Sequence, residues 1–197
     1  MRPTFDTYFM RLAELAASRA NCMKRGNGAI ITKDQRVIAT GYNGTPFGLT
    51  NCNEGGCKRC NDNVHQGIDL DKCLCLHAEE SAVMEAGRPR CLGGTIYTTS
   101  FPCQLCTKMI IQAGIVRIVY NKNYDSYLSK EMLAMTNIQI VCCNPETGTI
   151  KVTQNRDRTS PSQLLEEVIS QKTTGNGLDI PSNFNSPMKL KRQKTEV

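Results

Sequence analysis

The chain has 197 residues, of which 40% are hydrophobic and 21% charged, enough for one packed domain and too short for two large ones. Lys and Arg number 24 against 18 Asp and Glu, and the net charge of +6 suits an anionic small molecule. This charge is too diffuse, and the aromatic content of 6% too low, to favour binding of a polynucleotide. No apolar run approaches the roughly 20 residues of a membrane helix, so no membrane partner is expected.

The first predicted element is a helix over residues 4–22, in which Phe5, Tyr8, Phe9 and Leu12 recur at helical spacing. Asp6 and Glu14 within it argue against a signal peptide, so a cytoplasmic location is expected. Two short strands follow at 28–32 and 36–41, joined by a polar turn.

From residue 42 to about 73 the chain is rich in Gly, Asn and Cys and has no periodicity. A segment of this length needs something other than an apolar core to order it. The chain has 11 cysteines, an odd number, and a reducing compartment disfavours a disulfide framework. Bound metal is therefore the expected reason for the cysteines and for the order of this segment.

Helices and strands alternate in the second half. Helices are predicted at 77–87, 103–114 and 126–135, and strands at 95–100, 115–120 and 138–142. The order predicts an α/β fold, a three-layer α/β/α sandwich around a mixed, mostly parallel five-stranded sheet. Residues 1–154 are the expected zinc-dependent domain. Residues 155–197 read as a mostly disordered polar and basic tail with a short helix at 161–171, and the basic tract at 189–194 leaves a nuclear location open.

Two short motifs carry the chemistry: His77-Ala78-Glu79, and Pro102 followed by Cys103-Gln104-Leu105-Cys106. Each is expected at the start of a helix, where Cys103 and Cys106 share one turn and can bind one ion. One imidazole and two thiolates are three ligands, which leaves the open position of a catalytic zinc. Glu79 is then free to carry protons.

Each motif alone has an ordinary interpretation: an HxE occurs by chance, and a CxxC after a strand can be a redox pair. Together and in this order they match the H-x-E…P-C-x-x-C signature of zinc nucleobase deaminases.

The segments GYNGTPFGLTNC, CLCLHAEESA and FPCQLCTKMIIQAGI resemble the deoxycytidylate (dCMP) deaminase family, over about residues 5–142. The resemblance implies a cytidine-deaminase-like fold and a hydrolase of pyrimidine metabolism that converts dCMP to dUMP for thymidylate synthesis. It also implies control by dCTP and dTTP, with Mg²⁺ accompanying these nucleotides, and a homo-oligomer, often a hexamer.

Carried onto this chain, the resemblance makes His77, Cys103 and Cys106 the zinc ligands and Glu79 the proton carrier. Asn43 and Gly44 match a nucleotide-binding motif, and Tyr124 a tyrosine near the active site. Arg88 is a candidate contact for a phosphate or an effector, with a solvated loop as the ordinary interpretation. Two departures are Ser81, where the family has Asn, and Gly26-Asn27, which we expect to loosen the start of the first strand.

The cysteines upstream of His77 suit a second, structural zinc, with Cys22, Cys52, Cys57 and Cys75 as the expected ligands. Cys60, Cys73 and His65 compete for the same role, and some thiols can simply be small buried side chains.

Three other functions stay open. The first is a deaminase of a different cytosine- or adenine-containing substrate, such as a free nucleoside, tRNA, DNA or a riboflavin precursor. The others are a non-catalytic zinc-stabilised interaction module and a thiol redox protein. Glu79 argues against the module, because a structural zinc has no use for an open position. His77 and Pro102 have no role in a redox protein.

Overall fold

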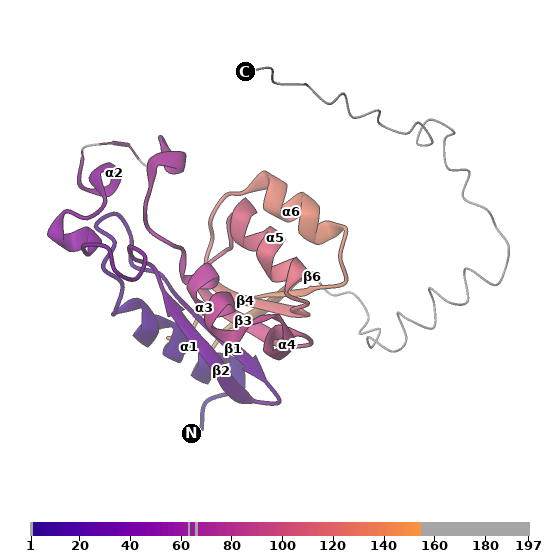
Figure 1. The fold of residues 1–197 in the computed structure, drawn as a ribbon. Coiled ribbons are helices and arrows are strands. Elements are labelled where there is room, and N and C mark those ends of the chain that lie inside the picture. Colours follow the sequence, from indigo (N-terminus) through magenta and orange to yellow (C-terminus); the bar gives the residue numbers. More distant parts are fainter. Residues whose placement is uncertain (1, 63, 66, 155–197) are drawn as a thin grey trace, which may run out of the picture. The chain divides into compact units, whose positions relative to one another are not determined.

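The computed structural model describes residues 2–62, 64–65 and 67–154. Its first element is the helix α1, Phe5–Ala17, shown in Figure 1. Thr4 caps its start, where the side-chain oxygen accepts a hydrogen bond from the Thr7 backbone N–H at 3.2 Å. The helix ends five residues before the predicted boundary.

Six strands form one sheet within the described residues, in the order β2-β1-β3-β4-β5-β6. Their bounds are β1 Gly28–Lys33, β2 Arg36–Tyr42, β3 Thr95–Ser100, β4 Arg117–Lys122, β5 Gln139–Cys143 and β6 Ile150–Gln154. The predicted α/β class and the first five strands are confirmed, and β6 is an additional edge strand.

The prediction of a mostly parallel sheet is wrong, because only the β3–β4 and β4–β5 pairings are parallel. β1 pairs antiparallel with both β2 and β3, and β5 pairs antiparallel with β6. A tight turn between consecutive strands forces antiparallel pairing. Asp34 and Gln35 make such a turn between β1 and β2 with φ of 50° and 59°, the twist that a two-residue hairpin needs.

The remaining helices are α2 Lys58–Asn61, α3 Ala78–Ala86, α4 Arg88–Cys91, α5 Gln104–Gln112 and α6 Tyr127–Ala134. Two short 3₁₀ turns, η1 Cys52–Glu54 and η2 Leu70–Lys72, flank α2 in the chain.

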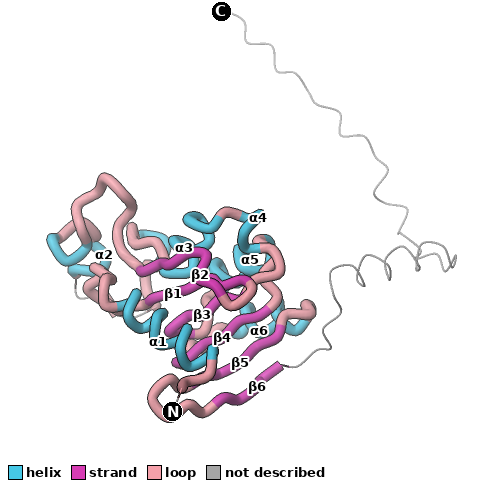
Figure 2. Tube along the Cα trace, turned by 90° about the horizontal axis from the view of Figure 1, so that it is seen from below, coloured by secondary structure: helices cyan, strands magenta, loops and turns pink. Residues whose placement is uncertain are grey.

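Side chains that alternate along the strands divide the core into two layers. Ile30, Tyr97, Val119 and Val141 pack with α1 on one face of the sheet. Ile31, Ile96, Ile118 and Ile140 pack on the other face with residues of α3, α5 and α6. The predicted three-layer sandwich is therefore confirmed, and α1 covers one face of the sheet while α3, α5 and α6 cover the other (Figure 2).

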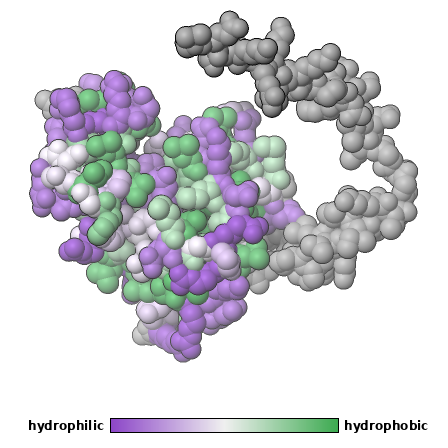
Figure 3. Space-filling model, in the orientation of Figure 1, coloured by the Kyte–Doolittle hydropathy of each residue, from purple (hydrophilic) through white to green (hydrophobic). Residues whose placement is uncertain are grey.

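Residues 43–76 lie outside these two layers, and the part of this segment that the structure describes contains no strand. Most of their large apolar side chains are exposed, namely those of Phe47, Leu49, Ile68, Leu70 and Leu74. The region around α2 accordingly shows a mostly hydrophilic surface (Figure 3). Its buried hydrophobic side chains are cysteines instead: Cys52, Cys57 and Cys60 form a cluster against which Cys22, Cys73 and Cys75 pack.

The predicted tail at 155–197, with its helix at 161–171 and its basic tract, lies outside the described residues. Among the residues described, no helix combines the length and apolar character that a membrane crossing requires.

One ion pair joins α1 to the sheet. Arg117 Nη1 and Nη2 donate to the two oxygens of Asp6 at 2.6 and 2.7 Å, and the Tyr97 hydroxyl donates to Asp6 Oδ1 at 2.9 Å. Both charged side chains are largely buried, 17% and 16% exposed. Burial raises the pKa of Asp6, but the hydrogen bonds and charge of Arg117 outweigh it and hold this pKa below its ordinary value.

We predict that Asp6→Asn lowers the free energy of unfolding by about 2–3 kcal/mol at neutral pH, because it leaves the largely buried Arg117 charge without the carboxylate that neutralises it. A lowered pKa in the folded state means that this contribution is complete above the unfolded-state pKa of Asp6 and is lost as the pH falls through the folded-state pKa. The difference between the two proteins should therefore shrink in acid. Urea unfolding across this pH range measures it.

The matched control is Asp125→Asn, which breaks the exposed ion pair with Lys130 and should change stability little. An equal loss in the two variants, or an Asp6→Asn difference that does not change with pH, would contradict the assignment.

Candidate functional site

His77 lies where the chain leaves the cysteine-rich segment and enters α3. Its backbone N–H donates to the Glu80 carboxylate at 2.7 Å, which caps the start of the helix. One residue earlier, Leu76 forms an antiparallel bridge with Gly44, with N–H to O distances of 2.9 and 3.3 Å. The position of His77 is thus fixed by contacts on both sides.

Cys103 and Cys106 lie at the start of α5, directly after β3 and Pro102. Cys103 is the N-terminal flanking residue of this helix and Cys106 lies in its first turn. Because α3 and α5 pack beside each other, the first turns of the two helices bring one imidazole and two sulfurs together.

The three ligand atoms are close enough to share one ion. His77 Nδ1 lies 3.3 Å from Cys106 Sγ and 3.4 Å from Cys103 Sγ, and all three atoms lie within 4.8 Å of one another. Three such donors, with no fourth ligand beside them among the residues that the structure describes, fit a zinc ion that keeps an open position.

The electrostatics of the group also fit a cation. A hydrogen bond from Cys106 lowers the pKa of Cys103 to about 4, and the Cys103 sulfur raises the pKa of His77 to about 9. The same sulfur and burial raise the pKa of Cys106. These directions favour a Cys103 thiolate beside a protonated His77 and a Cys106 thiol. A divalent cation held by the three residues would take the place of the two protons, because metals bind thiolate and neutral imidazole.

Glu79 lies on the first turn of α3 and is only 6% exposed. Its Oε2 accepts a hydrogen bond from the Cys106 thiol at 3.7 Å, and its Oε1 lies 3.1 Å from the Thr98 hydroxyl. Burial raises the pKa of Glu79, so this carboxyl holds a proton more readily than an exposed one. A buried carboxyl of this kind, beside a metal group but outside it, is suited to move protons.

Thr98 on β3 is a functional neighbour that the sequence analysis missed. It is fully buried, and its hydroxyl lies 3.1 Å from both Glu79 Oε1 and the Ser100 carbonyl oxygen. A hydroxyl has one proton, so a Thr98 that donates to Ser100 can accept from a protonated Glu79. The only signal in the sequence was a threonine in a strand that ends beside the cysteine motif.

Gly41 on β2 determines how closely α3 approaches the sheet. A Cβ atom at Gly41 would lie 2.2 Å from the Ala78 carbonyl oxygen and 2.5 Å from the Ala82 backbone nitrogen. No side chain fits between the strand and this helix. The turn that bears His77 and Glu79 is therefore in direct backbone contact with β2.

The predicted nucleotide motif lies beside this strand and is connected to the site. Asn43 is 6% exposed; its Oδ1 accepts from the Asn27 N–H at 2.7 Å, and its Nδ2 donates to the Arg25 carbonyl at 2.7 Å. At Gly44 a Cβ would lie 2.5 Å from Asn21 Oδ1, so any larger residue there would displace the Asn21 side chain.

Asn27 does not loosen the start of β1, contrary to our expectation. Its N–H and carbonyl bond to Asn43, and its Oδ1 accepts from the Thr99 hydroxyl at 3.3 Å. These bonds anchor the start of the strand to β3 and to the Asn43 motif.

Tyr124 and Arg88, two other predicted site residues, lie in different parts of the fold. Tyr124 lies in the loop after β4 and packs, half-buried, against the core that contains α3 and α5. Arg88 is exposed and begins α4, beyond the end of α3 opposite His77, and its Nε donates to the Gln112 carbonyl at 3.2 Å. The structure does not bring Arg88 to the metal group. Ser81 lies on α3 and is half-buried.

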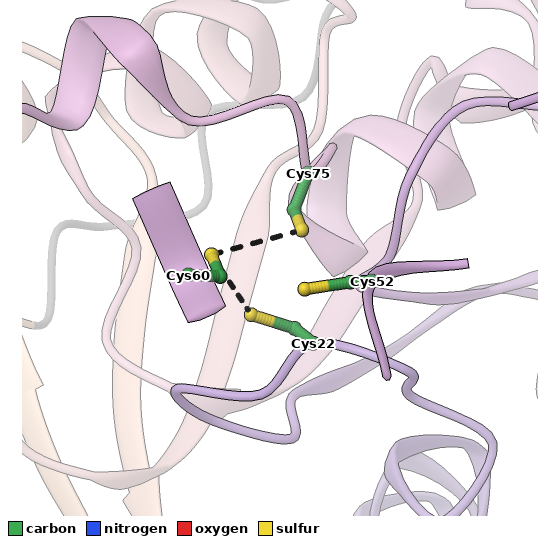
Figure 4. Close-up of side chains that lie close together, drawn as sticks. All are labelled: Cys22, Cys52, Cys60 and Cys75. Atoms are coloured by element: carbon green, nitrogen blue, oxygen red, sulfur yellow. Dashed lines mark hydrogen bonds between the residues drawn. The ribbon is translucent and has the colours of Figure 1, made fainter. Parts of the chain in front are cut away.

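The cysteines upstream of His77 form a second candidate metal centre. One group consists of Cys22, Cys52, Cys60 and Cys75. Their sulfurs lie within 4.8 Å of one another and point toward a common centre (Figure 4). A second group consists of Cys57, Cys60, Cys73 and Cys75. The structure thus brings Cys60, and not the predicted Cys57, together with Cys22 and Cys52. His65 is exposed and belongs to neither group.

Comparison with known proteins finds that the family model described as the cytidine and deoxycytidylate deaminase zinc-binding region matches residues 3–122. The chain is 55% identical over 125 residues to a deoxycytidylate deaminase of Schizosaccharomyces pombe and 56% identical over 125 residues to that of Saccharomyces cerevisiae. Each match covers 63% of this chain and 39% of the relative, so the chain spans about two fifths of the length of these relatives.

A crystal structure of dCMP deaminase from the cyanophage S-TIM5, in complex with dCMP and dUMP, is similar at a TM-score of 0.57 and 29% identity. This match covers 71% of the present chain and 97% of the phage chain.

Proposed function

Because this chain belongs to the cytidine and deoxycytidylate deaminase family, we propose that it converts dCMP to dUMP with release of ammonia. The observation that carries the proposal is the buried Glu79 carboxyl beside a group of one histidine and two cysteines. A structural zinc has four protein ligands, whereas this group has three and an adjacent acid. This combination supports a hydrolytic site.

We propose His77, Cys103 and Cys106 as the ligands of a catalytic zinc. When bound, zinc supplies a Lewis acid with an open position, at which water becomes acidic near neutral pH. The two cysteines at the start of α5 contribute thiolate charge, which the helix N-terminus stabilises.

Glu79 carries the protons of the reaction. Water adds to C4 of cytosine, and Glu79 accepts its proton and delivers it to N3 of the ring. The second proton of the water passes through Glu79 to the amino group, so that the C4–N bond breaks, ammonia leaves and C4 becomes a carbonyl. The raised pKa of Glu79 suits both halves of this transfer, and Thr98 keeps the carboxyl oriented toward Cys106.

The names of the relatives support dCMP as the substrate. The phage dCMP deaminase supports it as well, because the match covers 97% of the phage chain. We assign Asn43 and Gly44 a positioning role, because the contacts of their loop run to residues 25–27 and to Leu76 next to His77. Tyr124 is proposed to line the site, whereas Arg88 is not assigned to it.

The cysteines upstream of His77 are proposed to bind structural zinc, which orders a segment whose large apolar side chains are mostly exposed. The domain boundary at 154, effector control by dCTP and dTTP with Mg²⁺, hexameric assembly and a cytoplasmic or nuclear location stay predictions of the sequence and of the family resemblance.

The proposal is tested by the release of ammonia from dCMP, deoxycytidine, dCTP, cytosine and a tRNA anticodon stem, at equal concentrations and with the zinc-saturated chain. We expect dCMP to give dUMP with the largest kcat/KM. Release only from the free nucleoside or the tRNA would replace dCMP by that substrate, and no release from any of them would favour the non-catalytic module.

Glu79→Gln tests the role of the proton carrier. We expect kcat to fall by about 100-fold or more, because the amide cannot exchange protons, while the zinc content stays the same. Glu85→Gln on the exposed side of the same helix is the matched control and should retain full activity. If Glu79→Gln turns over dCMP at the rate of Glu85→Gln, the assignment of Glu79 is wrong.

A further inference from the structure

Six cysteines from four parts of the chain form the cluster upstream of His77, and we refer to them as the six-cysteine cluster: Cys22, Cys52, Cys57, Cys60, Cys73 and Cys75. Cys22 follows α1, Cys52 begins η1, Cys57 and Cys60 belong to α2 and its flank, and the last two precede His77. All six are free thiols, and three of them are buried.

The two ligand groups within this cluster overlap. Cys60 and Cys75 belong to both, and their sulfurs lie 4.0 Å apart. Cys22 and Cys52 belong only to the first group, Cys57 and Cys73 only to the second. The cluster thus consists of two sets of four sulfurs that have two sulfurs, those of Cys60 and Cys75, in common.

The distances between sulfurs agree with metal coordination. A tetrahedral zinc with Zn–S bonds of about 2.3 Å places its sulfurs about 3.8 Å apart. The Sγ–Sγ distance is 3.8 Å for Cys22–Cys60, 3.5 Å for Cys60–Cys73 and 4.0 Å for Cys57–Cys73. One of these distances lies in the first group and two lie in the second, so both groups have the spacing of a zinc site.

A second observation comes from the backbone. The N–H groups of Met23 and Leu74 donate to the sulfurs of Cys52 and Cys57, each at 3.4 Å. Thus both groups receive amide hydrogen bonds, and such bonds stabilise the negative charge of thiolates that bind a metal.

One zinc ion accounts for only part of this geometry. An ion in the first group leaves Cys57 and Cys73 without a metal, and an ion in the second group leaves Cys22 and Cys52. Cys52 of the first group and Cys57 of the second are both fully buried and both accept backbone hydrogen bonds. The structure therefore gives no reason to assign a single ion to one group rather than to the other.

We propose that the six-cysteine cluster binds two zinc ions, with the thiolates of Cys60 and Cys75 bridging them. Cys22 and Cys52 complete the coordination of one ion, and Cys57 and Cys73 that of the other. Two tetrahedral ions that share two sulfurs need six thiolates, which is the number in the cluster. The proposal concerns metal binding and does not depend on the identity of the substrate.

The two-ion cluster would connect distant parts of the chain. It joins the segment after α1 to α2 and to Cys75, which lies two residues before His77. Loss of the ion held by Cys22 and Cys52 would loosen the segment after α1. Loss of the ion held by Cys57 and Cys73 would loosen the segment that includes η2.

The first test counts metal in the full chain after saturation with zinc and removal of the excess. Native mass spectrometry should show about three zinc ions per chain, two in the cluster and one at the catalytic group. In the protein loaded with ¹¹³Cd, the NMR spectrum should contain two tetrathiolate signals that are split by coupling through the shared sulfurs. A single tetrathiolate signal, two unsplit signals, or a total of two zinc ions would overturn the proposal.

The second test removes a ligand that belongs to one ion only. Cys73 is half-buried, so Cys73→Ser disturbs packing little, and it should lower the count by one ion while the Cys22 and Cys52 ion stays. Cys142→Ser changes a half-buried cysteine outside the cluster and should retain the full count. If Cys73→Ser binds as much zinc as Cys142→Ser, Cys73 is not a ligand and the proposal fails. If Cys73→Ser does not fold, the metal count and the ¹¹³Cd spectrum of the unchanged chain decide.

Discussion

The backbone contact between α3 and Gly41 of β2 is the constraint on which the site depends. With a Cβ position only 2.2 Å from the Ala78 carbonyl oxygen, the helix and strand are as close as two backbones allow. On the opposite face of the sheet, a Cβ at Gly28 would lie 2.1 Å from the Ala13 carbonyl oxygen of α1. The β1–β2 hairpin is thus held between two helices. The first turn of α3 has little freedom to move, and its ligand and its acid keep their distance from the cysteines of α5.

A second constraint is electrostatic. A buried acid, Glu79, lies beside the thiols of Cys103 and Cys106. Burial disfavours a negative charge on each of these groups. A cation at the three donors and a proton on Glu79 each relieve this conflict. The same groups that make the site unfavourable without a cation therefore make it suitable for proton transfer beside one. The six-cysteine cluster resolves a similar conflict in a segment that lacks an apolar core.

Much of this arrangement follows from the sequence because its chemistry is local. His77 with Glu79, and Cys103 with Cys106, are each separated by one helical turn or less, so their spacing already fixes which side chains can meet. The α/β class follows from the alternation of apolar segments. The additional strand β6 was missed because four of its five residues are exposed and its sequence IKVTQ has little apolar character. The parallel content was overestimated because β1 pairs antiparallel with both β2 and β3, and because the unpredicted β6 pairs antiparallel with β5.

Other features depend on three-dimensional neighbours and have no local signal. Thr98 reads as an ordinary strand residue, and only the packing of α3 on the sheet brings Glu79 to it. Which of six cysteines share a metal cannot be read from their spacing, since Cys60 meets Cys22 across 38 positions of the chain. Asn27 looked like a weak start for a strand, but Asn43 and Thr99 compensate by hydrogen bonding to it.

The central claim is that the deaminated base binds between Glu79 and the group of His77, Cys103 and Cys106. A crystal structure of zinc-loaded Glu79→Gln with dCMP tests it most directly, because the substrate should persist in this variant. The account predicts that C4 of the cytosine faces the three ligands and that N3 lies within hydrogen-bonding distance of residue 79. A cytosine ring bound elsewhere, with residue 79 facing only protein, would contradict it.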